Sequence, residues 1–91
     1  MSKRTSQYRR AVGLSYQELE SDAPAVEFNG EHLMADQVVK IARRFGIPVV
    51  EKPALAQALG ELEVDQKIPA SLYEPVAVVL NQVDKALGRR R

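Results

Sequence analysis

The chain has 91 residues, of which 45% are hydrophobic and 27% charged, a composition typical of one small globular domain and unlike that of a disordered or collagen-like chain. It contains no cysteine, and its longest wholly apolar run is five residues, which excludes disulfides, thiolate chemistry and a membrane-spanning segment. The net charge of +1 conceals an asymmetry: residues 1–10 and 85–91 each carry four cations and no acid, whereas residues 11–84 carry five cations and twelve acids.

The first third of the chain predicts two strands. Residues 11–16 mix apolar and small residues at strand length, and the polar, acidic stretch 17–23 predicts a loop. A proline then opens the stretch 24–28, where apolar residues alternate with an acid as in a half-buried strand. Asn29 and Gly30 both tolerate positive φ, so we expect this strand to end there.

The clearest helix follows the second strand. Its apolar residues recur at spacings of four, three, one and three, and they predict one buried stripe made of Met34, Val38, Ile41, Ala42 and Phe45. Arg43 and Arg44 lie in the predicted last turn, where cations complement the helix dipole. Gly46 is placed as the left-handed residue that ends a helix, with Ile47 as the apolar residue after it.

Pro48 prevents this helix from resuming, and Val49-Val50 predicts a short buried strand. This strand would complete a strand-helix-strand unit in about 27 residues, which is short for such a crossover. Pro53 suits the first position of a second, short helix, and the charged stretch 61–67 predicts a loop.

The last predicted helix spans about residues 69–87. Its apolar stripe consists of Leu72, Val76, Val79, Leu80, Val83 and Leu87. Either Pro69 is its first residue or Ser71 caps it, and Pro75 predicts an irregular first turn. Together these elements predict the α/β class, with three helices around a small mixed sheet of three strands.

Residues that could carry chemistry are few and scattered. His32 is the only histidine, and with Glu31 and Asp36 nearby it offers at most a weak pairing. The glycines are spread singly, so no phosphate-binding loop is present. We expect no catalytic residue, no metal and no cofactor, and the residues alone indicate a small interaction domain.

The basic ends admit two interpretations. Short clusters of charge at chain ends usually only keep those ends solvated, but such clusters can also bind nucleic acid, acidic lipid or an acidic protein. Arg43 and Arg44 are the one close basic pair in the body, and the whole chain has five aromatic residues. This pattern disfavours nucleic acid as a partner.

The order of segments is more informative than any single one. The most specific segments are GIPVVE at 46–51 with Pro53, Leu55 and Ala56 behind it, and Ile68-Pro69 followed by Leu72-Tyr73, Val76-Ala77 and Val79-Leu80. From Ala11 to Val83 the chain resembles the cytoplasmic C-terminal domain of the flagellar export protein FlhB and its injectisome relatives YscU and EscU.

The resemblance implies a four-stranded sheet flanked by three to four helices, within a type III protein export apparatus of the bacterial inner membrane. It implies export substrates and other export-gate proteins as partners, and a cytoplasmic location at the inner face of that membrane. We therefore divide the chain into a basic segment at 1–10, an FlhB-like domain at 11–87 and a basic tail at 88–91. The sequence does not determine the oligomeric state, nor whether a flagellum or an injectisome is served.

Full-length relatives carry a transmembrane half and an Asn-Pro-Thr-His turn at which the chain cleaves itself. The asparagine side chain attacks its own carbonyl carbon, and the Asn–Pro bond breaks without a protease. The four matching positions here are Ser6, Gln7, Tyr8 and Arg9, and no Asn-Pro pair occurs in the chain. Because the predicted strand starts ten residues after Met1, we expect a stand-alone, non-enzymatic relative that lacks the membrane half and does not self-cleave.

The resemblance also implies an apolar substrate-docking patch, whose matching positions are Ala23, Pro24, Ala77 and Leu80. A shallow apolar patch suits a short disordered export signal that must bind weakly and be released. Leu80 lies on the stripe predicted to be buried, so Ala77 is the better surface candidate. Two rival functions remain, a generic protein-interaction adaptor that has lost the export role and a nucleic-acid-binding module that uses the basic ends.

Overall fold

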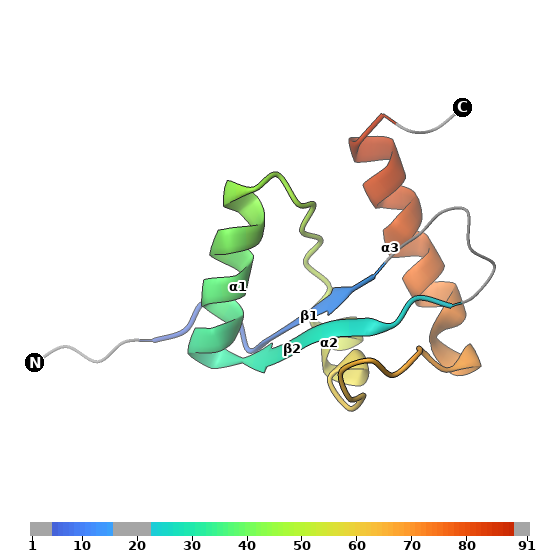
Figure 1. Cartoon of the computed structure of the whole chain (residues 1–91), viewed down its shortest axis with the longest axis horizontal. Coiled ribbons are helices and arrows are strands. Elements are labelled where there is room, and N and C mark those ends of the chain that lie inside the picture. The colour runs from blue at the N-terminus through green and yellow to red at the C-terminus, as the bar shows by residue number, and fades with distance from the viewer. Residues whose placement is uncertain (1–4, 16–22, 89–91) are drawn as a thin grey trace, which may run out of the picture.

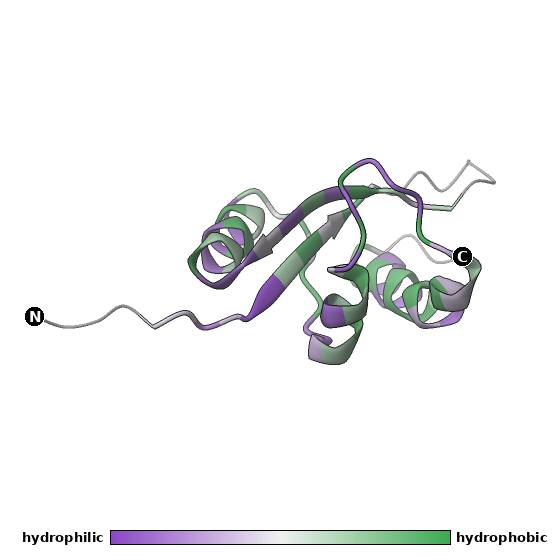
Figure 2. Ribbon diagram, turned by 90° about the horizontal axis from the view of Figure 1, so that it is seen from below, coloured by the Kyte–Doolittle hydropathy of each residue, from purple (hydrophilic) through white to green (hydrophobic). Residues whose placement is uncertain are grey.

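The structure is a computed structural model that describes residues 5–15 and 23–88. Its elements are, in chain order, β1 (Arg10–Leu14), β2 (Val26–Glu31), α1 (His32–Arg44), α2 (Pro53–Leu59), the short 3-10 helix η1 (Ala70–Leu72) and α3 (Tyr73–Ala86). The two strands form an antiparallel pair, with α1 on one side of it and α2 and α3 on the other (Figures 1 and 2). The predicted α/β class is therefore confirmed.

The alternation of side chains along β1 separates the two layers. Ala11 lies opposite Gly30 and Gly13 opposite Phe28 in the register, so one face of the pair carries mainly small residues. This face receives α1, whose Ala35 and Val39 are buried.

Val12 and Leu14 point to the opposite face and pack against the main core. The centre of that core is formed by Leu59 of α2, Ile68 of the following loop and Val76 of α3, all at most 5% exposed. Figure 2 shows the hydrophobic colour over much of α3. Of the predicted stripe, Val76 is buried and Leu87 is 43% exposed, and the other members are half-buried. Removing these side chains from water is the main source of stability in a domain this small.

Most helix ends agree with the sequence predictions. Gly46 has a φ of +74°, its N–H donates to the carbonyl of Arg43, and the N–H of Ile47 donates to the carbonyl of Ala42. This is the hydrogen-bond pattern of a Schellman motif. Pro53 is the first residue of α2, as expected.

The start of the last helix is irregular, as predicted. η1 precedes α3, and the N–H of Leu72 donates to the carbonyl of Pro69. Pro75 is the third residue of α3, where a backbone N–H would have no partner within the helix. Ser71 makes no side-chain capping bond in either helix.

β2 does not end at Asn29 and Gly30, contrary to the prediction, but continues to Glu31. A Cβ atom on Gly30 would lie 2.6 Å from the Phe28 ring. The glycine therefore leaves room for the ring of Phe28, which lies two residues earlier on the same face of β2, and does not turn the chain. The described part of the predicted loop at 17–23 is its last residue, and residues 16–22 lie outside the described residues.

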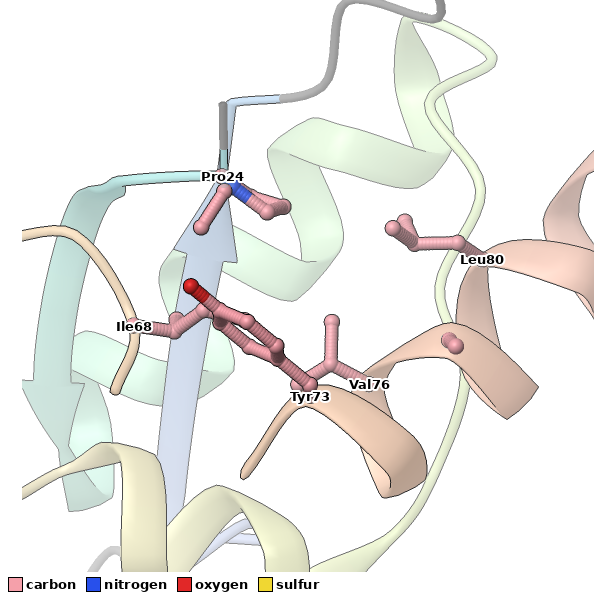
Figure 3. A pocket seen from close by; sticks show the side chains of 7 residues that line it. Pro24, Ile68, Tyr73, Val76 and Leu80 are labelled. Carbon is pink, nitrogen blue, oxygen red and sulfur yellow. The ribbon is translucent and has the colours of Figure 1, made fainter. Parts of the chain in front are cut away.

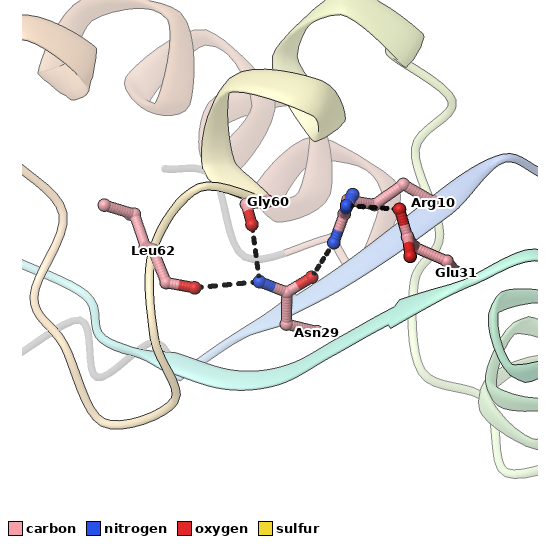
Figure 4. Close-up of polar contacts among 5 residues, drawn as sticks. All are labelled: Arg10, Asn29, Glu31, Gly60 and Leu62. Atoms are coloured by element: carbon pink, nitrogen blue, oxygen red, sulfur yellow. Dashed lines mark hydrogen bonds and ion pairs between the residues drawn. The ribbon is translucent and has the colours of Figure 1, made fainter.

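The Asn29 side chain has a structural role of its own. Its Nδ2 donates to the backbone carbonyls of Gly60 (3.0 Å) and Leu62 (2.8 Å), and its Oδ1 accepts from the guanidinium of Arg10. The same guanidinium forms an ion pair with Glu31 at 2.7 Å. Figure 4 shows how these contacts hold the turn after α2 against β2.

The predicted strand at Val49-Val50 is wrong. In the described part of the chain the sheet has two strands, supplemented by one isolated bridge between Ala25 and Lys67, rather than three or four. A strand requires a hydrogen-bonded neighbour, and these two half-buried valines form no ladder with β1 or β2. The predicted crossover to a parallel strand is therefore absent from the described residues.

The predicted buried stripe of α1 is also largely wrong. Met34, Ile41 and Phe45 are 58%, 44% and 72% exposed, whereas Ala35 and Val39 form the buried contact. The helix is rotated so that its small residues, rather than its largest ones, meet the sheet. Within the described residues, no helix combines the length and apolar character needed to cross a bilayer.

Candidate functional site

The four positions that sequence analysis singled out as a docking patch line one apolar hollow. Its volume is about 270 Å³, and its lining residues are Ala23, Pro24, Ile68, Tyr73, Val76, Ala77 and Leu80. None of the seven carries a charge. The hollow opens between α3 and the segment that leads into β2 (Figure 3).

The wall formed by Pro24 is fixed by backbone hydrogen bonds on both sides. The carbonyl of Pro24 accepts the N–H of Ile68 at 3.0 Å, and the carbonyl of Ala25 accepts the N–H of Ser15 at 2.9 Å. Pro24 has no N–H to contribute, and its position just before β2 needs none. Two segments far apart in sequence are thus held together as one wall.

The opposite wall is one face of α3. Tyr73, Val76, Ala77 and Leu80 follow at spacings of three, one and three, which places them on the same side of a helix. Val76 is 1% exposed and belongs to the core, whereas Ala77 is exposed and Leu80 is half-buried. Ala77 is therefore on the surface, as expected, and Leu80 both packs on the core and lines the hollow.

Three lining residues, Ile68, Tyr73 and Val76, are not among the positions predicted for the docking patch. The helical spacing from Ala77 back to Tyr73 and Val76 was the signal that could have found two of them. Ile68 comes from a loop, and only the fold brings it beside Pro24. Figure 3 shows the Tyr73 ring between Ile68 and Val76, with its hydroxyl directed toward Pro24.

The residues that line the hollow offer mainly apolar contact. An apolar hollow of this size fits roughly one or two large side chains of an extended peptide. His32 is exposed at the start of α1, away from the lining residues. Within residues 5–15 and 23–88, no three His, Asp or Glu side chains gather where they could hold a metal ion.

The positions that match the self-cleaving turn lie at the other end of β1. The backbone N–H groups of Gln7 and Tyr8 both donate to the carboxylate of Asp36, and the carbonyl of Arg9 accepts the N–H of His32. Ser6 precedes them and is half-buried. This short segment is therefore held against the start of α1.

The Tyr8 side chain extends these contacts toward the segment between α1 and α2. Its hydroxyl donates to Glu51 at 3.0 Å, and Arg43 forms an ion pair with the same carboxylate at 3.3 Å. Hydrogen bonding to Tyr8, together with Glu51, raises the pKa of the Arg43 guanidinium above its ordinary value. These contacts join the segment before β1, α1 and the 47–52 segment at one end of the domain.

Comparisons with known proteins agree with this architecture. The model of the FlhB HrpN YscU SpaS family matches residues 8–83. The uncharacterized protein YlqH of Bacillus subtilis is 36% identical over 83 residues, covering 91% of this chain and 89% of its own length. The secretion system apparatus protein SsaU of Salmonella typhimurium is 43% identical over 76 residues, and the flagellar biosynthetic protein FlhB of Aquifex aeolicus is 38% identical over 74.

The chain spans about a fifth of the length of SsaU and FlhB (22% and 21%) while these matches cover 82% and 80% of the chain itself. Among solved structures, the PscU C-terminal domain matches with a TM-score of 0.77 and 37% identity over 82% of this chain and 96% of that one. A mutated EscU C-terminal domain matches with a TM-score of 0.76 and 32% identity over 82% and 81%.

Proposed function

This chain belongs to the FlhB HrpN YscU SpaS family, and from that membership we propose that it serves a bacterial type III protein export apparatus as a non-enzymatic component. It binds export substrates through the apolar hollow between Pro24 and α3, on the cytoplasmic side of the inner membrane. The other proteins of the export gate are its second class of partner.

One observation supports substrate binding above all others. The family resemblance implies Ala23, Pro24, Ala77 and Leu80 as the docking positions, and all four line the same hollow. Residues from such distant parts of the chain share one hollow only because of the fold. An apolar hollow without charged lining suits a signal that is read by a few apolar side chains rather than by charge pairing.

The hollow is also suited to reversible binding. It is shallow and lies on top of the core, so its floor is rigid while its rim is exposed. A disordered signal loses conformational entropy on binding, which keeps its affinity low for the area that it buries. Weak, fast-released binding is what sequential export of many substrates requires.

The proposed function also excludes self-cleavage of this chain. The family reaction needs an asparagine followed by proline at the turn before β1, and Ser6 and Gln7 stand there instead. Serine and glutamine lack the asparagine side chain that attacks its own carbonyl carbon.

A peptide titration tests the proposal. Fluorescence anisotropy with labelled export-signal peptides of early substrates should show saturable binding to the whole chain. Ala77→Glu places a charge on the rim and Pro24→Asp places one on the facing wall, so each should weaken binding by roughly tenfold or more. Val78→Glu is the matched control, because Val78 adjoins Ala77, is 51% exposed and does not line the hollow.

Equal affinity of the wild type and Ala77→Glu for these peptides would refute the docking role. Circular dichroism of each variant shows whether its fold is intact. If no export component is recovered with the chain from a cell that has the apparatus, the generic adaptor function becomes the better explanation.

A further inference from the structure

The surface of α1 carries an apolar stripe that the fold leaves uncovered. Met34, Val38, Ile41 and Phe45 follow at spacings of four, three and four, the pattern of a face that is normally buried. Three of them are 44% to 72% exposed. The stripe lies far from the hollow, because α1 is on the opposite side of the strands from α3.

The stripe ends in a protruding turn. The Schellman motif at Gly46 reverses the chain at the end of α1 and leaves Phe45 72% and Ile47 56% exposed on either side of the glycine. Figure 1 shows this end of α1 standing clear of α2 and α3. We call Phe45, Gly46 and Ile47 the α1 tip.

Cations outnumber acids around the α1 tip, with Lys40, Arg43 and Arg44 against Asp36 and Glu51. Lys40 and Arg44 are both exposed, lie four residues apart on adjacent turns, and have no ion pair with any other described residue. The acids nearby are engaged: Asp36 accepts the N–H groups of Gln7 and Tyr8, and Glu51 binds Tyr8 and Arg43. The α1 tip therefore combines exposed apolar side chains with a net positive charge, because Glu51 is offset by Arg43 and two further cations stand against Asp36.

We propose that the α1 tip binds an anionic lipid bilayer. Phe45 and Ile47 enter the boundary between headgroups and acyl chains, and Lys40 and Arg44 contact the acidic headgroups. Large apolar residues flanked by cations are the combination with which peripheral proteins bind such surfaces. The two exposed cations beside the apolar tip match the acidic headgroups of such a bilayer, whereas a purely apolar protein partner would leave Lys40 and Arg44 unpaired at the edge of its interface.

Vesicle co-sedimentation of the full chain tests this proposal. The wild type should bind vesicles of phosphatidylcholine containing about 30% phosphatidylglycerol, with binding that weakens as salt is raised, and should not bind pure phosphatidylcholine. The double variant Phe45→Ser with Ile47→Ser should bind the anionic vesicles roughly fivefold less. Lys40→Gln with Arg44→Gln should lower binding to a similar degree.

The matched control is Val78→Ser, which removes an apolar side chain of 51% exposure from α3 and should bind as the wild type does. Absence of binding to anionic vesicles, equal binding to neutral ones, or unchanged binding of both double variants would each overturn the proposal. The charge variant keeps the test valid if the apolar variant fails to fold. Ala77→Glu should keep full vesicle binding. The vesicle assay therefore tests lipid binding separately from the substrate docking that the peptide titration tests.

Discussion

The carboxylate of Asp36 accepts the backbone N–H of Tyr8 at 2.8 Å, across 28 residues of sequence. It also accepts the N–H of Gln7, at 3.0 Å and 2.9 Å to its two oxygens. One side chain on α1 therefore satisfies two consecutive backbone donors just before β1. It positions the residues that stand where full-length relatives have their self-cleaving turn.

Asp36→Ala should release this segment. The bonds are charge-assisted but close to solvent, so we expect a loss of about 1 kcal/mol in the free energy of unfolding. Trypsin should then cut faster after Arg9 and Arg10, because Asp36 no longer holds the backbone of Gln7 and Tyr8 against α1. Urea denaturation and timed proteolysis measure the two effects. Gln37→Ala, at an exposed neighbouring position, is the control, and equal behaviour of the two variants would contradict the assigned role.

Asn29 is expected to be more sensitive than any exposed position of β2. Asn29→Ala leaves the carbonyls of Gly60 and Leu62 without their donor and the Arg10 guanidinium without one acceptor. Because these groups are part-buried, we expect a loss of about 2 kcal/mol in the free energy of unfolding. Urea denaturation measures it, and the exposed Glu27→Ala on the same strand should change stability by less than about 0.5 kcal/mol. A similar loss for both would remove the special role of the Asn29 side chain.

The sequence predicted those features that one residue controls through its own backbone. Gly46 ends α1 and Pro53 begins α2 because their conformational preferences act locally. The buried face of α1 could not be predicted in the same way. Both Met34 and Ala35 begin apolar stripes, and the choice between them depends on the small residues of β1 and β2 that meet the helix. Likewise, the valines at 49–50 have strand propensity but no partner strand.

The candidate site shows the same division. Pro24 and Ala77 were found through a resemblance in segment order, which carries information about the fold that periodicity lacks. Ile68 was missed because a loop residue joins the hollow only through its backbone bond to Pro24. Tyr73 lies four residues before Ala77 and could have been predicted from helical spacing. Spacing alone, however, does not show whether a residue lines the hollow or faces solvent elsewhere.

Gly46→Ala tests the Schellman motif in isolation. A Cβ atom at this position would meet nothing within 4 Å, so any destabilisation comes from the backbone, which has a φ of +74°. We expect a loss of about 1 kcal/mol in the free energy of unfolding. Gly46→Asn should lose less, because asparagine tolerates this conformation better. Thermal or urea unfolding ranks the stabilities of the wild type and the two variants. Equal stability of Gly46→Ala and the wild type would show that the turn is not held at positive φ.

The chain should also remain intact in solution. Incubation of the purified protein at neutral pH for days should leave one mass in intact-mass spectrometry, because Ser6 and Gln7 stand where the family reaction needs asparagine and proline. Restoring asparagine and proline at these two positions is the informative variant. Its spontaneous scission would show that the turn geometry survives, whereas scission of the wild type between residues 5 and 10 would contradict the proposed lack of self-cleavage.

Val76 and Ala77 are adjacent on α3, but we expect substitutions at the two positions to have different effects, on stability at Val76 and on peptide binding at Ala77. Val76 is 1% exposed and sits in the core beneath the hollow, so Val76→Ala removes two methyl groups from a packed site and should lower the free energy of unfolding by about 2 kcal/mol. Ala77 is exposed on the rim, so Ala77→Glu should change stability by less than about 0.5 kcal/mol. Peptide affinity should show the reverse order, with the larger loss for Ala77→Glu, because Val76→Ala deepens the hollow without adding charge. If both variants lost stability and affinity in the same proportion, the hollow would be only a part of the core and not a binding surface.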